Sequence, residues 1–108
     1  MLWLQTAAEL RAATLQAYRA ARVHLDAALA DPTWTAAPEQ PGDYASLPPA
    51  GILDMDEAIV RSDRFQAWLV AEARPFRIED WNEWVRSETS VPVPGALEYV
   101  GEARARGI

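Results

Sequence analysis

One short apolar run constrains the fold of this chain more than any other feature. Residues 50–56, Ala-Gly-Ile-Leu-Asp-Met-Asp, follow a Pro-Pro pair and end in acids, which is typical of a buried parallel strand. One parallel strand cannot form a sheet, because neighbouring strands must supply its backbone hydrogen bonds. The sequence therefore predicts the α/β fold class, with residues 1–108 as the first part of a single larger domain whose second strand would follow Ile108.

Helical and irregular segments flank this predicted strand. Residues 3–30 are rich in Ala, Leu, Arg, Glu and Gln and repeat their apolar residues at helical spacing, which predicts one long leading helix that ends at Asp31-Pro32. Thr6 and Glu9 have the spacing of a capping box, which would start this helix slightly later. The expected organisation is a leading helix over 1–31, a Pro-rich connector lying across the surface over 32–49, the strand over 50–56, and a helical segment over 57–108.

The helical segment is expected to contain three shorter helices. These cover residues 64–73, 79–88 and 96–106, with a break over 91–95. In the last of them, Leu97, Val100 and Ala103 are expected to face inward. Gly107 stands where a helix C-terminal glycine belongs, so a chain that continued past it would enter a new strand.

Composition and charge exclude several classes of protein. The 108 residues include 16 acidic and 10 basic side chains, a net charge of −6, and no cysteine. The acidic balance argues against a nucleic-acid polymer as partner, since such a footprint needs clustered Lys and Arg. Absence of cysteine excludes disulfides, thiolate zinc sites and cysteine nucleophiles. No stretch reaches the roughly 18 to 20 apolar residues of a membrane-spanning helix, and the start lacks the basic region of a signal peptide.

The strongest chemical signal is the acid pair at the end of the predicted strand. Ligands bind at the carboxyl ends of strands in parallel α/β sheets, and Asp54 and Asp56, two residues apart, would point the same way. Two close carboxylates repel and favour a shared divalent cation, for which Mg²⁺ is the natural candidate. A carboxylate can also attack phosphorus and form an aspartyl-phosphate, while a second one protonates the leaving oxygen. An Asp-x-Asp pair alone also occurs in ordinary surface turns.

Further motifs extend in order along almost the whole chain. They lie at residues 5–9, 16–18, 26–29, 42–49, 52–57, 65–70, 80–81, 84–85, 93–100 and 105–107. Together they resemble acid phosphatases of the haloacid-dehalogenase (HAD) superfamily, and more narrowly the bacterial class B/C enzymes of the lipoprotein 5′-nucleotidase group. The resemblance implies a doubly wound, mostly parallel sheet with a helical cap, and Mg²⁺-dependent hydrolysis of phosphomonoesters at acidic pH.

The resemblance also assigns roles to individual residues. Asp54 matches the family's nucleophile, and Asp56 matches its general acid/base, whose backbone carbonyl also binds the metal. Trp81 matches an aromatic residue that stacks on the base of a nucleoside 5′-monophosphate. Two departures concern Ala58, where the family usually has Thr, and Arg61, where it usually has an acid.

The same resemblance implies a setting and leaves alternatives open. It implies a cell-envelope parent, periplasmic or secreted, that meets the membrane only through a lipid anchor absent from this chain. The later catalytic motifs of the family are not found within residues 1–108, so the chain by itself is expected to be inactive. A different reading is a non-catalytic remnant whose long helix serves as an interaction module, for example in a homo-oligomer. A third reading is a phosphotransferase that passes the aspartyl-phosphate to an alcohol.

Overall fold

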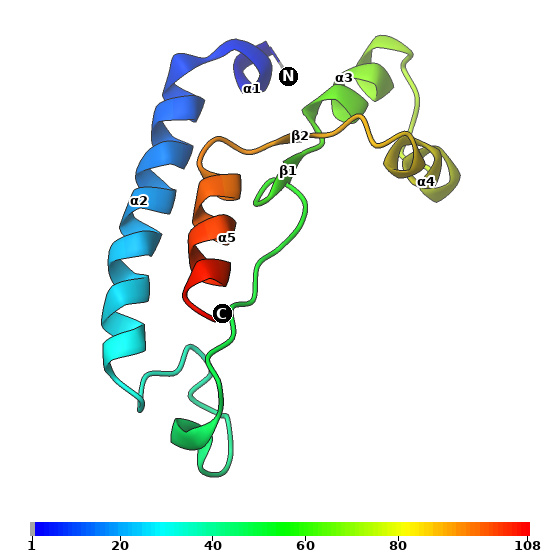
Figure 1. The fold of residues 1–108 in the computed structure, drawn as a ribbon. Helices are drawn as coiled ribbons and strands as arrows, with labels where there is room; N and C mark the ends of the chain where they lie inside the picture. Colours follow the sequence, from blue (N-terminus) through cyan, green and yellow to red (C-terminus); the bar gives the residue numbers. More distant parts are fainter. Residues whose placement is uncertain (1) are drawn as a thin grey trace.

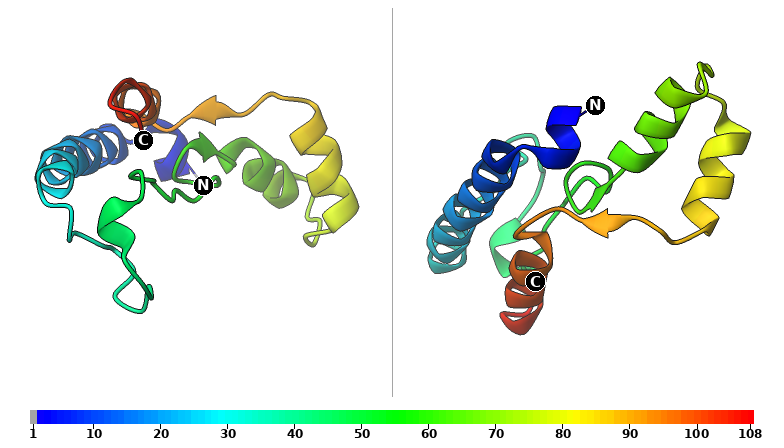
Figure 2. Two further views of the ribbon diagram at one scale, coloured as in Figure 1. Left: turned by 60° about the horizontal axis from the view of Figure 1, so that its bottom comes forward. Right: turned by 90° about the horizontal axis from the view of Figure 1, so that it is seen from above.

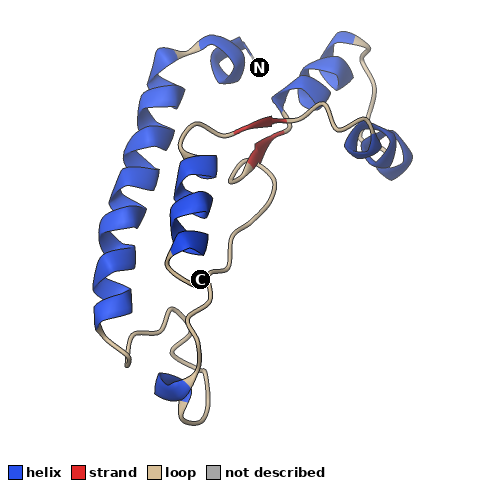
Figure 3. Ribbon diagram, in the orientation of Figure 1, coloured by secondary structure: helices blue, strands red, loops and turns tan. Residues whose placement is uncertain are grey.

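The computed structural model describes residues 2–108 and shows helices joined by long irregular segments, with a small sheet of two short strands (Figures 1 and 3). In this part of the chain the elements are α1 (Leu2–Thr6), α2 (Ala8–Ala30), η1 (Tyr44–Ser46), β1 (Val60–Arg61), α3 (Asp63–Ala71), α4 (Ile78–Arg86), β2 (Val91–Pro92) and α5 (Ala96–Ala105). Helices α3, α4 and α5 confirm the three shorter helices that the sequence predicts. The mixture of helices and a small sheet is consistent with an α/β chain, while the doubly wound sheet stays a prediction.

The molecule is open in shape. Helices α2 and α5 lie side by side at one end, and α3 and α4 form a second group at the other end, with β1 and β2 between them (Figures 1 and 2). The radius of gyration is 17.4 Å, against about 13 Å for a compact chain of this length. The two helical groups therefore bury separate small sets of side chains and share no common core.

The leading helix is interrupted near its start. Residues 3–30 do not form one helix, because Ala7 has an extended backbone with ψ of 125° and separates α1 from α2. The predicted capping box is also wrong: the Thr6 hydroxyl donates to the Leu2 carbonyl inside α1, and no side chain caps α2. The Arg61 guanidinium donates to the Leu4 carbonyl, so a contact with a distant residue holds α1 toward α3. Local helix propensity could not reveal that contact.

The other end of α2 is as predicted. Helix α2 stops at Asp31, whose carboxylate accepts hydrogen bonds from the amide (2.9 Å) and the hydroxyl (2.7 Å) of Thr33. The connector that follows is irregular apart from η1. It projects beyond the end of α2 and so does not lie across the surface, contrary to expectation (Figure 1).

The predicted strand over 50–56 is not formed. Residues 50–54 have no regular structure, Ile52 is 99% exposed, and Asp56 makes only an isolated bridge with Val60 (Figure 3). Among residues 2–108 no strand lies beside this segment to take up its backbone hydrogen bonds, which accounts for the difference. The C-terminal residue does approach it: a Cβ on Gly51 would lie 3.6 Å from Cγ2 of Ile108.

The sheet that does form is an antiparallel pair. Strand β1 pairs with β2 in the register Val60 with Pro92 and Arg61 with Val91, and the amide of Val93 extends the pairing by donating to the Ile59 carbonyl at 2.9 Å. The sequence predicts only a break over 91–95, since the two prolines there disfavour a strand. Because Pro92 lies on an edge, its missing amide costs no sheet hydrogen bond.

Each helical group has its own small apolar centre. Between α3 and α4, Phe65 is 2% exposed and Leu69 is buried beside it. Between α2 and α5, the buried residues are Val93, Ala96 and Ala103, so Ala103 faces inward as predicted. The inward position expected for Leu97 is wrong, because that side chain is 60% exposed.

Ion pairs complete the contact between α2 and α5. Arg22 of α2 pairs with Glu102, and Arg106 pairs with Asp26 of α2 and with Glu102.

Gly107 has φ of +87°, as predicted for a helix C-terminal glycine. No helix among residues 2–108 combines the length and the apolar character that crossing a membrane requires.

Candidate active site

The segment that begins at Asp54 is a tight turn, called the acidic turn (residues 54–60). The amides of Ile59 and Val60 both donate to the Met55 carbonyl at 3.0 Å, and the amide of Glu57 donates to the Val60 carbonyl at 2.8 Å. Glu57 has φ of +59°, a left-handed conformation that is uncommon for a residue with a side chain. The turn therefore bends the chain sharply between the acid pair and β1.

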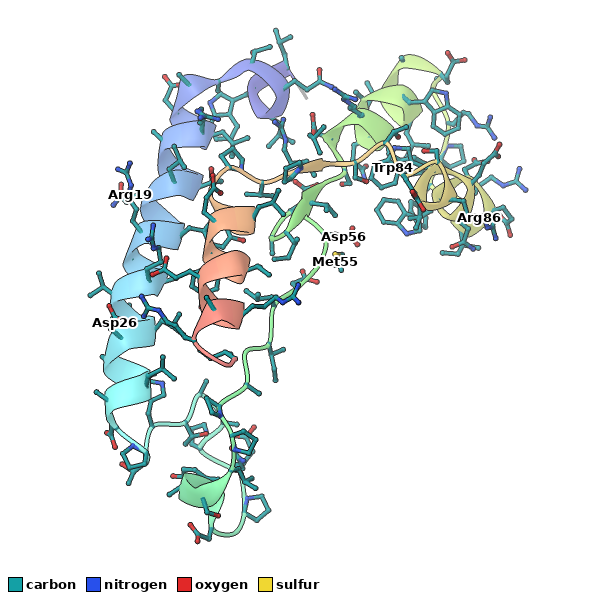
Figure 4. All side chains as sticks on the ribbon, in the orientation of Figure 1. Arg19, Asp26, Met55, Asp56, Trp84 and Arg86 are labelled. Carbon is teal, nitrogen blue, oxygen red and sulfur yellow. The ribbon has the colours of Figure 1, made fainter. Side chains whose placement is uncertain are left out.

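Both acids of the pair are accessible on this turn. Asp54 is exposed, and its Oδ1 accepts a hydrogen bond from the amide of Met55 at 2.8 Å. Asp56 is also exposed, and Figure 4 shows it with Met55 on the side of the chain that faces away from α5. The two carboxylates flank one residue of a constrained turn and have free oxygen atoms for a ligand.

The third acid of the motif has a structural contact instead. A carboxylate oxygen of Glu57 accepts hydrogen bonds from the amide of Ser62, at 2.8 Å, and from its hydroxyl. Ser62 precedes the first residue of α3 and is 5% exposed. Glu57 thus connects the acidic turn to the start of α3.

The donor set bears on the expected Mg²⁺. Among residues 2–108 no group of three or more acidic or histidine side chains lies close enough together to hold a metal ion. Mg²⁺ commonly needs only one or two carboxylates when waters and a substrate phosphate complete its shell. Asp54 and Asp56 therefore fit a Mg²⁺ that is shared with a phosphate, and they do not form an all-protein site.

Trp81 lies in an aromatic cluster of α3, α4 and the loop between them. Its ring centroid is 5.0 Å from that of Trp84, 5.1 Å from Phe65 and 6.2 Å from Phe76. Such tilted and edge-on pairs stabilise the group beyond the burial of area. Trp81 thus has a packing role in this structure, and its contact with a substrate stays a prediction.

A pocket of about 410 Å³ opens next to this cluster. It is lined by Arg64, Phe65, Trp68, Arg74, Asp80, Glu83, Trp84 and Ser87. Two of these charges are already paired: the Arg74 guanidinium lies 4.8 Å from the Trp68 ring and 3.0 Å from the Asp80 carboxylate. The sequence analysis does not identify Trp68 and Trp84 as pocket residues. Their spacing could have indicated it, because Trp68 follows Phe65 and Trp84 follows Trp81 by three residues, which puts each pair on one face of its helix.

The two departures from the family pattern have clear places in the structure. Arg61 ion-pairs with the buried Asp63 at 2.9 Å and donates to the Leu4 carbonyl, so its charge is engaged by α3 and α1. Ala58 contributes its backbone carbonyl, which accepts a hydrogen bond from the hydroxyl of Tyr18 on α2. Burial and, to a smaller extent, the neighbouring Tyr99 raise the pKa of Tyr18 above its ordinary value.

Comparison with known families identifies the class of this chain. All of it, residues 1–108, matches the family described as HAD superfamily, subfamily IIIB (acid phosphatase). The chain belongs to this family, which confirms the family-level resemblance and identifies phosphatase-type chemistry on small phosphate esters. The narrower likeness to the lipoprotein 5′-nucleotidase group is finer than this match and remains a proposal.

Proposed function

We propose that this chain carries the nucleophile and the general acid/base of a Mg²⁺-dependent acid phosphatase. The observation that supports the proposal is the pair of exposed carboxylates, Asp54 and Asp56, at the start of a constrained turn in a chain of the acid phosphatase family. Among residues 2–108, the only hydrogen bond to either carboxylate is the one from the amide of Met55 to Oδ1 of Asp54, so oxygen atoms of both acids are available to a ligand.

The reaction follows from the chemistry of two carboxylates. The Asp54 carboxylate attacks the phosphorus of a phosphomonoester, the bond to the leaving oxygen breaks, and Asp56 gives that oxygen a proton. Asp56 then takes a proton from a water molecule, which attacks the aspartyl-phosphate and releases inorganic phosphate with Asp54 restored. Mg²⁺, when bound by Asp54 and Asp56, would neutralise charge on the phosphate and reduce the repulsion between the two acids.

The organic half of the substrate is proposed to lie against the aromatic cluster. Trp81 is the residue that we propose to contact a nucleoside 5′-monophosphate, since stacking on an indole contributes about 1 to 3 kcal/mol per base. Location in the cell envelope belongs to the same proposal and rests on the resemblance alone. We further propose that residues 1–108 alone turn over little substrate, because two carboxylates provide a weak Mg²⁺ site.

The test is an Asp54→Asn substitution. The assay measures Mg²⁺-dependent hydrolysis of p-nitrophenyl phosphate between about pH 4 and 8, a range that covers carboxylate and histidine titration. It is applied to the 108-residue chain and to the complete protein translated from its reading frame, called the full product. In the full product, D54N should reduce turnover more than a hundredfold, because covalent catalysis contributes several kcal/mol. Asp43→Asn is the matched control, since that exposed acid lies in the connector and caps nothing.

The outcomes separate the candidate functions. Turnover by D54N above about a tenth of the wild-type rate would contradict the nucleophile assignment. A full product without any phosphatase activity would favour the non-catalytic helical module. That alternative has one supporting observation, since no residue of the 23-residue α2 is buried and Val23 is 69% exposed. Analytical ultracentrifugation would then be expected to show a helix-paired dimer.

A further inference from the structure

We propose that Tyr18 is a positioning residue that holds the acidic turn in its reactive geometry from the neighbouring helix α2. The inference rests on the proposed function, in which Asp54 and Asp56 of this turn react with the phosphate. Carboxylates that act together need to be held to within about 0.5 Å, so the backbone that carries them must itself be fixed.

The acidic turn has little support of its own. Residues 54–57 are exposed, and besides its own short-range backbone hydrogen bonds the turn has the contact from Glu57 to Ser62 and the hydrogen bond from the amide of Val93 to the Ile59 carbonyl. From helix α2, the Tyr18 hydroxyl donates to the Ala58 carbonyl at 2.5 Å. Among residues 2–108 this is the only hydrogen bond to the turn from the side chain of a helical residue. It joins residues 40 positions apart in the chain.

The position of the Tyr18 ring is in turn fixed by α5. The ring centroid of Tyr99 lies 5.5 Å from that of Tyr18. At the start of α5, a Cβ on Gly95 would lie 3.1 Å from Cβ of Tyr18, so only a glycine lets the backbone approach this closely. The Tyr99 ring and the backbone at Gly95 therefore fix the position of the Tyr18 ring. The hydroxyl of that ring in turn fixes the position of the Ala58 carbonyl.

The hydroxyl is also a stable donor. Its partial burial raises the pKa of Tyr18, so the proton that it donates to Ala58 is retained through neutral and mildly alkaline solution. The side chain at position 58 takes no part in this contact. The alanine found there in place of the usual threonine leaves the contact intact, because the acceptor is the backbone carbonyl.

The experiment compares Tyr18→Phe with Tyr44→Phe in the 108-residue chain by amide hydrogen exchange. Y18F keeps the ring and removes the hydroxyl. Y44F is the matched control, because its hydroxyl donates to the Thr33 carbonyl in the distant connector. In Y18F the amides of the acidic turn, at residues 57, 59 and 60, should exchange about fivefold faster, as expected for the loss of one hydrogen bond. In Y44F the same amides should exchange at the wild-type rate.

Two results would overturn the proposal. Unchanged exchange at residues 57, 59 and 60 in Y18F would show that the hydroxyl does not hold the turn. An equal acceleration throughout α2 and α5 would show that Tyr18 acts on global stability only. Neither result depends on phosphatase activity, so failure of the proposed function is detected separately. In the full product, a positioning role also requires that Y18F lower kcat for p-nitrophenyl phosphate at least about fivefold with KM unchanged. Equal kcat in Y18F and Y44F would contradict the role in catalysis.

Discussion

Substitution of Gly95 by alanine should destabilise the protein strongly, although the side chain added is a single methyl group. Gly95 has φ of +93° at the start of α5, a left-handed conformation that costs an alanine about 1 to 2 kcal/mol. The added Cβ would lie 3.1 Å from Cβ and 3.2 Å from Cδ2 of Tyr18, and the first of these atoms is fixed to the backbone of α2. Crowding of this kind typically costs about 1 to 3 kcal/mol more. The expected total is about 3 kcal/mol.

Two other glycines provide matched controls for this variant. Gly101 lies inside α5, and a Cβ added there would meet nothing within 4 Å beyond its chain neighbours and the backbone of its own helix, so Gly101→Ala should stabilise by about 0.5 to 1 kcal/mol. Gly107 has φ of +87° and also has open space around it, so Gly107→Ala should show the conformational cost without the contact. The ranking expected for stability is therefore Gly101→Ala, wild type, Gly107→Ala and Gly95→Ala, from highest to lowest.

The assay is urea unfolding followed by circular dichroism at about 222 nm. With a slope of about 1 kcal/mol per molar urea, the midpoints of Gly95→Ala and Gly101→Ala should differ by more than about 2 M. If Gly95→Ala unfolded within about 0.5 M of wild type, the close approach of Tyr18 to the start of α5 would be wrong. If Gly95→Ala merely matched Gly107→Ala, the strain would be conformational alone.

Three further predictions concern charged and hydroxyl groups. Arg61→Met leaves the carboxylate of Asp63, which is 5% exposed, without its ion pair, and urea unfolding should show a loss of about 3 kcal/mol. The pKa of Tyr18 is raised above its ordinary value of 10.0, so the stability that its neutral hydroxyl contributes is complete below pH 10 and disappears as the pH rises through the raised value. Tyr18→Phe should therefore remove this part of the alkaline loss of stability, measured as urea midpoints from about pH 8 to 12. The Thr33 hydroxyl, and to a smaller extent its amide, hold the pKa of Asp31 below the ordinary 3.8, so Thr33→Ala should raise it in an NMR titration, and an unchanged value would contradict the hydrogen bond.

The helices could be predicted because their signals are local. The helical spacing of Phe65 and Leu69 puts both on one face of α3, and both are buried in the structure. Gly107 was predictable for the same reason, since a left-handed residue after a helix favours glycine wherever the helix lies. These features depend on a few neighbouring residues and little on the rest of the molecule.

The features that could not be predicted depend on distant partners. Residues 50–54 have the composition of a strand, yet a strand exists only where another one pairs with it. The break at Ala7 coincides with the hydrogen bond from Arg61 to Leu4, which joins residues 57 positions apart. Periodicity within a window of residues contains no information on either.

The candidate site divides in the same way. Asp54 and Asp56 were recognisable from their spacing and their place after an apolar run, and the structure shows both exposed on a constrained turn. Their chemical roles stay predictions. Tyr18 was not recognisable as a neighbour of the turn, because its hydrogen bond to Ala58 depends on how α2 lies against the rest of the chain.

The pairing of β1 with β2 makes the α3–α4 group a detachable insertion. The chain enters this group through Arg61 and leaves it through Val91, and these two residues are partners in the same register. Ser62 and Asp63 at its start bind Glu57 and Arg61, but the part of the segment that follows them can be exchanged while the paired strands keep its two ends together. In an evolving or engineered phosphatase, the aromatic pocket between α3 and α4 can therefore change while the acidic turn and its support from α2 keep their structure.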